Sequence, residues 1–153
     1  MQDPNCIFCQ MVTGQAPCHK VWEDAHYLAF LSIYPNTEGI TIVIPKLHTS
    51  SYLFDQTDGA ITDIMLAAKQ VASRLLHVFD TASRVGIVFE GYGVNHLHVK
   101  LFPLHGTHRV WRPIKSTLTT RYTTYPGYIS THDVERADDT VLDALAKRLR
   151  EGG

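Results

Sequence analysis

A long amphipathic segment in the middle of the chain constrains the fold more than any other feature of the sequence. Between residues 57 and 78, apolar side chains recur at intervals of three and four, which is the period of one face of an α-helix. They are Ile61, Ile64, Met65, Ala68, Val71, Ala72, Leu75 and Leu76. Thr57 or Asp58 can cap its first turn. The sequence therefore predicts one long helix with a single apolar face.

Runs of residues typical of β-strands precede and follow this predicted helix. Residues 20–24 form a possible short strand, and 27–33 and 40–44 are β-rich runs joined by the turn-rich segment 34–39. We expect the two runs to form an antiparallel pair. After the helix, residues 84–90 predict a further strand, and the glycine-rich link that follows is short enough for a hairpin.

The next stretch, 95–103, carries two histidines and a lysine at alternate positions. We expect a short strand that Pro103 ends, because proline has no N–H to donate. Successive side chains alternate faces, which sets Leu97, Val99 and Leu101 against His96, His98, Lys100 and Phe102. The polar row can face an extended anion, or it can be a half-exposed polar surface. Gly91 and Gly93 permit a tight turn or a close backbone approach to a ligand, which favours the first interpretation.

Composition and charge limit the classes of function. The chain has 153 residues, of which 44% are hydrophobic and 19% charged, as is usual for one globular domain. A net charge of -1 provides no overall field for nucleic acid or an anionic membrane, so a phosphate ligand must be held locally. No apolar run approaches a membrane span, and the N-terminus lacks a basic stretch followed by an apolar one. We therefore expect a cytoplasmic protein that makes no membrane contact.

The cysteines predict a second site. Three cysteines argue against a disulfide framework, but Cys6 and Cys9 form a Cys-x2-Cys pair, which serves either as a redox centre or as half of a zinc site. The pair does not follow a strand of a βαβ unit, as a thioredoxin-type centre requires, so metal is favoured. His48 and His96 are candidates for the two further ligands. Alternatively both thiols are reduced, with one packed as a small hydrophobe, and Cys18 has no assigned role.

Beyond Gly106 the chain becomes aromatic and rich in proline, and a final helix is predicted from about residue 133 to residue 150. The aromatic and basic residues in this segment include Trp111, Arg112, Tyr122, Tyr125 and Tyr128. Such residues can stack on nucleobases. The favoured alternative is that the segment packs on its own domain or on a partner subunit.

Taken together, the motifs resemble a known superfamily. The segments 6–9, 20–24, 28–31, 43–48 and 96–101 match, in order, the pattern of the histidine triad (HIT) superfamily. The resemblance implies an α+β fold with about five antiparallel strands, a long helix and a C-terminal helix, often assembled as a homodimer. It implies a HIT-like catalytic domain at 1–106 and an extension at 107–153. Proteins of this kind bind nucleotides and hydrolyse or transfer nucleotidyl groups.

The resemblance also assigns roles to the histidines and cysteines. It makes His98 the nucleophile that attacks a nucleotide α-phosphate, with its other ring nitrogen donating to a backbone carbonyl. It makes Cys6, Cys9, His48 and His96 the ligands of a structural zinc ion that braces the catalytic segment.

The substrate-binding residues that the resemblance implies are Lys100, Ser32, Phe30, Ile33, Phe89 and Tyr92. Several of them depart from the family pattern. Lys100 replaces the third histidine, where it can contact phosphate as a point charge and disfavour protonation of His98. Ser32 stands where many relatives carry a ribose-binding aspartate, and Gly93 where a serine or threonine often assists the leaving group. Phe89 lies near a position that is commonly asparagine, and Tyr92 can fill part of the gap left at Gly93.

Three functions are compatible with these residues. The leading hypothesis is a zinc-containing nucleotidyl hydrolase or transferase acting on nucleoside phosphoramidates or dinucleoside polyphosphates. The second is a nucleotide-binding or zinc-stabilised interaction module without turnover, because several departures occur together. The third is processing of nucleic-acid ends with the basic aromatic tail, and the near-neutral charge makes it the least favoured.

Overall fold

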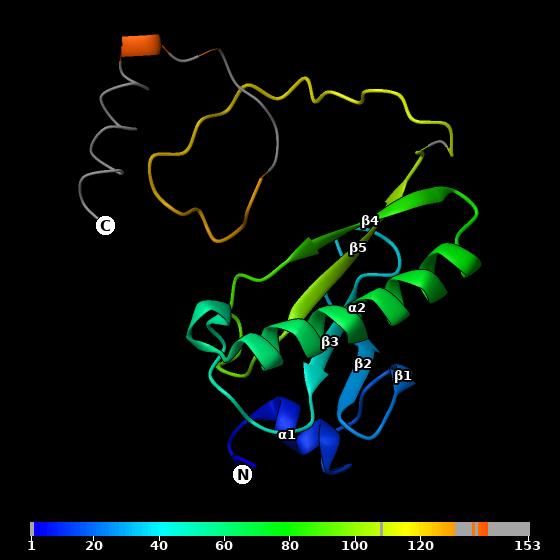
Figure 1. Cartoon of the computed structure of the whole chain (residues 1–153), viewed down its shortest axis with the longest axis vertical. Helices are drawn as coiled ribbons and strands as arrows, with labels where there is room; N and C mark the ends of the chain where they lie inside the picture. The colour runs from blue at the N-terminus through cyan, green and yellow to red at the C-terminus, as the bar shows by residue number, and fades with distance from the viewer. Residues whose placement is uncertain (1, 108, 131–135, 137, 141–153) are drawn as a thin grey trace. The chain divides into compact units, whose positions relative to one another are not determined.

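The computed structural model describes residues 2–107, 109–130, 136 and 138–140 of the chain. Its elements follow one another as α1 (Ile7–Val12), β1 (Lys20–Glu23), β2 (Tyr27–Leu31), β3 (Thr41–Pro45), a short 3-10 turn (Leu53–Asp55), α2 (Asp58–Val78), β4 (Ala82–Val88) and β5 (Val99–His105) (Figure 1). The chain divides into two compact units, Met1–Trp111 and Arg112–Gly153. All of these elements belong to the first unit.

The five strands form one antiparallel sheet with the order β1-β2-β3-β5-β4. β2 and β3 pair residue for residue, with Leu28 opposite Ile44, which confirms the predicted antiparallel pair. β5 lies between β3 and β4, with Val99 opposite Val43 and Lys100 opposite Val88. The α+β fold that the resemblance implied is therefore present. The last strand in the sequence, β5, lies in the interior of the sheet and not at its edge.

The boundaries of β5 differ from the prediction at both ends. The strand begins at Val99 and not at residue 95, because the N–H of Leu97 donates to the carbonyl of Thr49, in the loop after β3, at 3.1 Å. It also continues through Pro103 to His105. β3 pairs with β5 only from Val99 to Leu101, so Pro103 has β4 as its one neighbouring strand. A strand tolerates proline at such an edge, and the expectation that Pro103 ends the ladder was wrong.

α2 covers one face of the sheet and confirms the predicted helix. Thr57 is its N-cap, and its hydroxyl accepts a hydrogen bond from the N–H of Ala60. The buried side chains of the helix are Ile64, Ala67, Ala68, Val71 and Leu75. They pack on the apolar row of β5 and on the facing residues of β2 and β3, including Ala29 and Val43. Met65, expected on the apolar face, is exposed.

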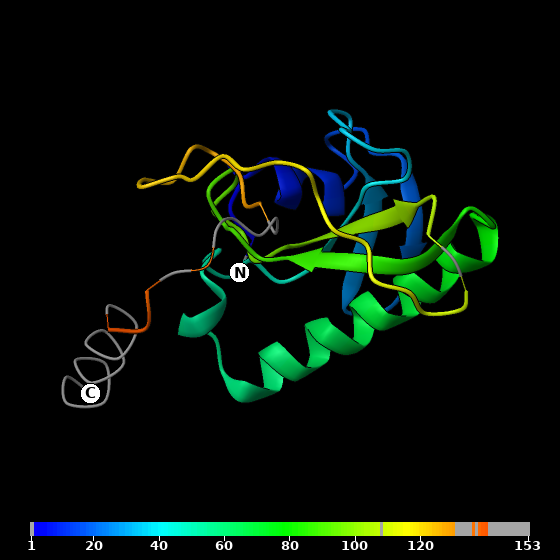
Figure 2. The same ribbon diagram turned by 90° about the horizontal axis from the view of Figure 1, so that it is seen from above.

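A short helix that the sequence analysis did not predict covers the opposite face of the sheet. α1 has six residues, and Figure 2 shows it on the side of the sheet away from α2. Phe8 and Cys9 of this helix are buried with Leu28, Phe30 and Ile44 in a second apolar cluster. Because alternate side chains of β2 and β3 point to opposite faces, the same strands supply both clusters. The second cluster sets the first turns of the chain against the sheet.

The second unit contains the aromatic segment noted in the sequence. Side chains from 112 to 130 are exposed, and the hydroxyl groups of Tyr122 and Tyr128 are in hydrogen-bond contact. Apart from residues 136 and 138–140, the helix predicted at 133–150 lies outside the described residues. None of the helices in the described part of the chain combines the length and hydropathy that a bilayer-crossing segment needs.

Candidate metal centre and adjoining histidine

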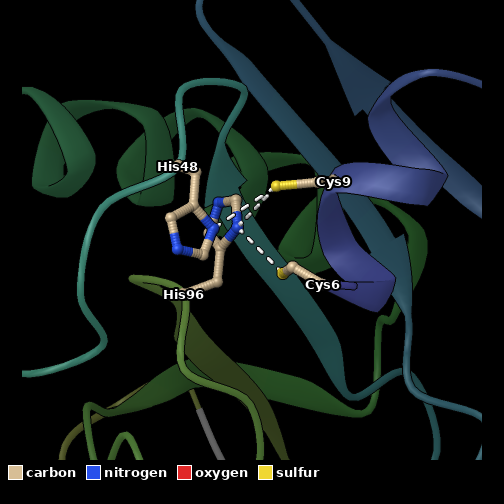
Figure 3. Close-up of side chains that lie close together, drawn as sticks. All are labelled: Cys6, Cys9, His48 and His96. Atoms are coloured by element: carbon tan, nitrogen blue, oxygen red, sulfur yellow. Dashed lines mark hydrogen bonds between the residues drawn. The ribbon is translucent and has the colours of Figure 1, made fainter. Parts of the chain in front are cut away.

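Four side chains from three separate parts of the chain meet beside α1. Cys6 is the N-cap of α1 and Cys9 lies in its first turn, whereas His48 follows β3 and His96 precedes β5. Their ligand atoms all lie within 4.8 Å of one another, and Cys6, Cys9 and His96 are buried. Figure 3 shows both thiols directed from the start of α1 toward the two imidazole rings. The structure thus brings together the four residues predicted as metal ligands.

The separations within this group suit a tetrahedral zinc site. Cys6 Sγ lies 3.5 Å from His96 Nδ1, and Cys9 Sγ lies 3.4 Å from His48 Nδ1 and 3.7 Å from His96 Nδ1. Zinc bonds of about 2.3 Å to sulfur and about 2.0 Å to nitrogen, at the tetrahedral angle, place sulfur and nitrogen about 3.5 Å apart. Two thiolates and two imidazoles are also a common structural zinc set. The donors therefore fit the ion in kind, number and spacing.

The hydrogen bonds of His96 orient its ring toward the cysteines. His96 Nε2 lies 2.8 Å from the carbonyl oxygen of Pro45, and a carbonyl oxygen only accepts, so Nε2 carries the proton. The unprotonated Nδ1 then faces the two sulfur atoms. Burial lowers the pKa of the His96 imidazole, and the hydrogen bond to Pro45 opposes this shift. A neutral ring whose far nitrogen is held by a carbonyl is the state that a metal ligand requires.

The thiols are free and partly supported by the backbone. The described chain contains three free cysteines, and Cys6 and Cys9 are the two buried ones. The N–H of Asp3 points to Cys9 Sγ at 3.4 Å. Burial raises the pKa of the Cys9 thiol, whereas the Asp3 N–H lowers it. Metal coordination favours the thiolate, so a bound cation would offset the effect of burial.

His98 is buried beside this centre and its ring is held in the opposite tautomer. Its Nδ1 lies 2.7 Å from the backbone carbonyl of His96, so Nδ1 donates and Nε2 keeps its lone pair. Burial lowers the pKa of the His98 imidazole, and the hydrogen bond to His96 raises it. The charge of Lys100 lowers this pKa further, as expected from the sequence, and the charge of Glu90 raises it. His98 is therefore a neutral base with a defined free nitrogen.

Phe8 forms a wall against both histidines and was missed in the sequence. Its ring meets those of His96 and His98 edge to face, with centroids 5.8 and 5.5 Å apart, and also contacts Phe30 at 5.4 Å. The sequence did hold a clue to its role, because Phe8 lies between Cys6 and Cys9. If both cysteines of this short helix face the sheet, a residue between them packs against the sheet as well. Phe30 is buried in the same cluster.

Lys100 makes an ion pair that the sequence analysis also missed. Its ammonium group contacts the carboxylate of Glu90, which follows the end of β4. The pair is partly buried, with 29% of the Lys100 side chain and 12% of the Glu90 side chain exposed. The third position of the motif is thus occupied by a cation whose charge is largely balanced.

The other predicted substrate-binding residues lie at different depths. The Ser32 hydroxyl accepts a hydrogen bond from the N–H of Tyr34 at 3.2 Å, and Ile33 is exposed beside it in the loop after β2. Phe89 packs against the apolar cluster on the α2 side of the sheet, away from the His98 face. Tyr92 is 83% exposed. These four residues therefore do not form one compact group with His98 in this structure.

A large cavity lies elsewhere in the first unit. It measures about 950 Å³ and is lined by residues of β1, β2, the segment from Pro45 to Thr49 and α2, including Trp22, Tyr27 and Asp63. None of the four predicted metal ligands, nor His98, lines it. The size of this cavity therefore says nothing about the histidine site, which lies on the other face of the sheet.

Comparison with known proteins identifies the family. The model of the HIT domain matches residues 13–107, which is more than half of the chain. This chain is a HIT protein. The matched part of the HIT domain includes His48, His96 and His98 but begins after Cys6 and Cys9. In the folded HIT domain, α1 nevertheless brings both cysteines to the two histidines.

Three relatives bear on the site of this HIT protein. An adenosine 5'-monophosphoramidase of Schizosaccharomyces pombe is 34% identical over 103 residues, covering 65% of this chain and 74% of that one. A solved structure from Streptococcus mutans UA159 is 27% identical with a TM-score of 0.69, covering 99% of this chain and 87% of that chain. A zinc-bound histidine triad family protein from Mycobacterium smegmatis is 30% identical with a TM-score of 0.60, covering 65% and 74%.

Proposed function

We propose that this HIT protein is a nucleotidyl hydrolase or transferase in which His98 is the nucleophile. The observation that carries the proposal is the hydrogen bond from His98 Nδ1 to the His96 carbonyl, because it leaves a lone pair on Nε2 in a buried, neutral ring. The relationship to an adenosine 5'-monophosphoramidase supports nucleotide chemistry of this class. The substrates proposed are nucleoside phosphoramidates or dinucleoside polyphosphates.

The proposed reaction has two displacements. His98 Nε2 attacks the α-phosphorus, a P–N bond forms, and the bond from phosphorus to the leaving group breaks with its electron pair on the leaving amine or phosphate. The leaving group takes a proton from solvent. The imidazole becomes cationic in this nucleotidyl-histidine, and the His96 carbonyl stabilises the proton that remains on Nδ1. Water or another acceptor then attacks phosphorus and loses a proton, and the P–N bond breaks with its electron pair on Nε2, which restores the neutral ring.

The substrate is proposed to bind on the His98 side of the sheet. Lys100 contacts the phosphate oxygens as a point charge. Phe30, Ile33, Ser32 and Tyr92 remain the residues proposed to bind the rest of the nucleotide. Phe89 is proposed with them, although it packs on the α2 side of the sheet and would have to leave that position to reach the ligand. Ser32 and Ile33 share the loop after β2, and Tyr92 is exposed in the link between β4 and β5, so side chains of these loops must order around a ligand.

We further propose that Cys6, Cys9, His48 and His96 hold a zinc ion. Their donor set and spacing support this, as does the zinc-bound relative. The ion supplies a cross-link between α1, the end of β3 and the segment before β5. Its ligand His96 also provides the carbonyl that fixes the His98 tautomer, so the residues of the metal centre position the nucleophile.

The remaining expectations concern assembly and location. We propose a catalytic domain at 1–106 and an extension at 107–153 that packs on the same domain or on the partner of a homodimer. We also propose a cytoplasmic location, which the free thiols support. Light scattering coupled to size-exclusion chromatography tests the dimer, and a monomer at micromolar concentration contradicts it.

A direct test compares the wild-type protein with the variant His98→Ala. Both are incubated with adenosine 5'-phosphoramidate and with diadenosine polyphosphates, and an exposed histidine variant on α2, His77→Ala, serves as the matched control. We expect turnover in wild type and His77→Ala and a loss of at least about 10³-fold in His98→Ala. A phosphorus-labelled substrate should label wild type transiently and His98→Ala not at all. Equal inactivity of all three proteins on a broad nucleotide panel sinks the proposal.

The second candidate function is a nucleotide-binding module without turnover. The Lys100–Glu90 ion pair favours it in one respect, because the cation at the third motif position is already partnered. Calorimetry separates the two: tight nucleotide binding with no label on His98 supports the module, whereas labelling supports the enzyme.

A further inference from the structure

The partner of Lys100 is built into the sheet. Lys100 lies opposite Val88 in the β4–β5 ladder, and Glu90 follows two residues after Val88. This places Glu90 beside the start of β5, the strand that carries Lys100, and the two side chains form an ion pair. The two charges act on the pKa of His98 in opposite directions: Lys100 lowers it and Glu90 raises it. The charges next to the nucleophile therefore belong to a pair and not to a free ammonium group.

The backbone around Glu90 is fixed independently of that ion pair. Gly91 adopts φ +73°, a left-handed conformation that favours glycine, and a Cβ there would lie 3.0 Å from the carbonyl oxygen of Ser51. The N–H of Ser51 in turn donates to the Asn95 side chain at 3.1 Å. The loop that carries Glu90 is thus tied to the loop after β3, so the backbone at Glu90 has a defined position.

The position of this carboxylate affects which phosphates the site accepts. The α-phosphate of a phosphoramidate or of a dinucleoside polyphosphate carries one negative charge, whereas a nucleoside monophosphate carries up to two near neutral pH. An ammonium group alone would attract the doubly charged group more strongly. A carboxylate beside it in a partly buried site cancels much of that preference, because Coulomb interactions there are several times stronger than in water.

Resting on the proposed function, we propose that Glu90 is a positioning and specificity-determining residue. It holds the Lys100 ammonium at the third motif position and biases the site toward singly charged phosphates and against the doubly charged monophosphate product. The pair thereby limits product inhibition while keeping a cation for the reacting phosphate.

The test measures binding and needs no turnover. Calorimetry determines the ratio of the dissociation constants of adenosine 5'-monophosphate and its singly charged methyl ester for wild type, Glu90→Gln and Lys100→Ala. We expect Glu90→Gln to shift this ratio in favour of the doubly charged ligand by at least about fivefold. Lys100→Ala should shift it in the opposite direction, because the carboxylate then acts on the ligand without the Lys100 cation beside it. Glu90→Asp should keep most of the wild-type ratio.

Controls separate this effect from general charge or folding effects. Asp80→Asn removes one exposed negative charge at the end of α2 and should leave the ratio unchanged. Melting temperature establishes that each variant is folded. In an active protein, Glu90→Gln should also tighten inhibition by the monophosphate more than it changes kcat. An unchanged ratio in folded Glu90→Gln, or the same shift in Asp80→Asn, overturns the inference. Inactivity of wild type with the expected ratios instead overturns the proposed function alone.

Discussion

His96 Nε2 and the carbonyl oxygen of Pro45 lie 2.8 Å apart, and this contact sets the tautomer of one histidine while His96 sets that of the next. His96 presents Nδ1 to the cysteines because Nε2 donates to Pro45. His98 presents Nε2 because Nδ1 donates to the carbonyl of His96. Two histidines separated by one residue thus offer opposite ring nitrogens, one suited to a metal and the other to phosphorus.

The metal centre predicts a zinc content of about one ion per chain in protein purified without added zinc. Cys6→Ser and His48→Ala each remove one donor and should lower both the zinc content and the melting temperature. The physical reason is that a bound ion stabilises the folded chain over an unfolded chain that lacks the site. Elemental analysis and thermal unfolding provide the two measurements.

Matched variants show whether the loss is specific to the centre. Cys18→Ser and His26→Ala change the same residue types outside the group and should retain the metal. Removal of the ion by a chelator should lower the melting temperature of wild type and of these controls. Protein that is metal-free and equally stable contradicts a structural zinc site.

Phe8→Ala should destabilise the fold by about 3–5 kcal/mol, because it removes a buried ring and leaves a cavity against two histidines. Phe54→Ala is the control: that ring is 76% exposed, and its loss should change the free energy of unfolding by less than about 0.5 kcal/mol. Chemical denaturation at saturating zinc measures both. A similar small effect from the two substitutions means that α1 contributes little to the core.

Three glycine-to-alanine variants separate backbone strain from crowding. Gly93→Ala meets no atom within 4 Å and has no left-handed φ, so we expect a change between neutrality and a gain of about 1 kcal/mol. Gly14→Ala is left-handed but open, so strain alone should reduce stability by about 1–2 kcal/mol. Gly91→Ala combines the same strain with the contact to Ser51 and should be the least stable. Denaturant midpoints give the order of stability of the three variants. If Gly91→Ala is as stable as Gly14→Ala, the contact with Ser51 does not crowd the alanine side chain.

Glu23 predicts a small acid-sensitive contribution to stability. Hydrogen bonds from Lys20 and Lys46 lower the pKa of the Glu23 carboxyl from its ordinary 4.5 to about 2. Because the pKa is lowered in the folded protein, the ionised Glu23 carboxyl stabilises the fold at pH values above 4.5. This stabilisation is lost as the pH falls from 4.5 toward 2. The melting-temperature difference between wild type and Glu23→Gln should therefore close over that range. Because the group is exposed, added salt should also reduce the difference.

The sequence predicted the elements whose residues repeat with a clear period. α2 displays its period over 21 residues, and β2 and β3 are short β-rich runs on either side of a turn. α1 has only six residues, too few for a helical period to be visible, and its cysteines were recognised by spacing instead. The residue at which β5 ends depends on how far β3 and β4 pair with it. The residues of β5 alone carry no information about that pairing.

Within the site, the ligands were predictable and their supports were not. The four predicted metal ligands could be recognised because thiols and imidazoles bind metal ions and occur here in the order of the family pattern. They are Cys6, Cys9, His48 and His96. The supports of the two histidines are backbone carbonyls, at Pro45 and His96, and every residue has a carbonyl. Glu90 is likewise one acidic residue among many until the β4–β5 ladder places it against Lys100.

The contact between Cys6 and His96 also has a consequence for synthesis on the ribosome. The two residues are 90 positions apart, so α1 emerges long before the segment that completes its surroundings. During that interval the two thiols lack His96, and the Phe8 ring lacks both histidines, because the segment before β5 is still being made. A nascent chain therefore passes through a period in which its cysteines are open to oxidation or to stray metal, and His98 acquires its fixed ring only when that period ends.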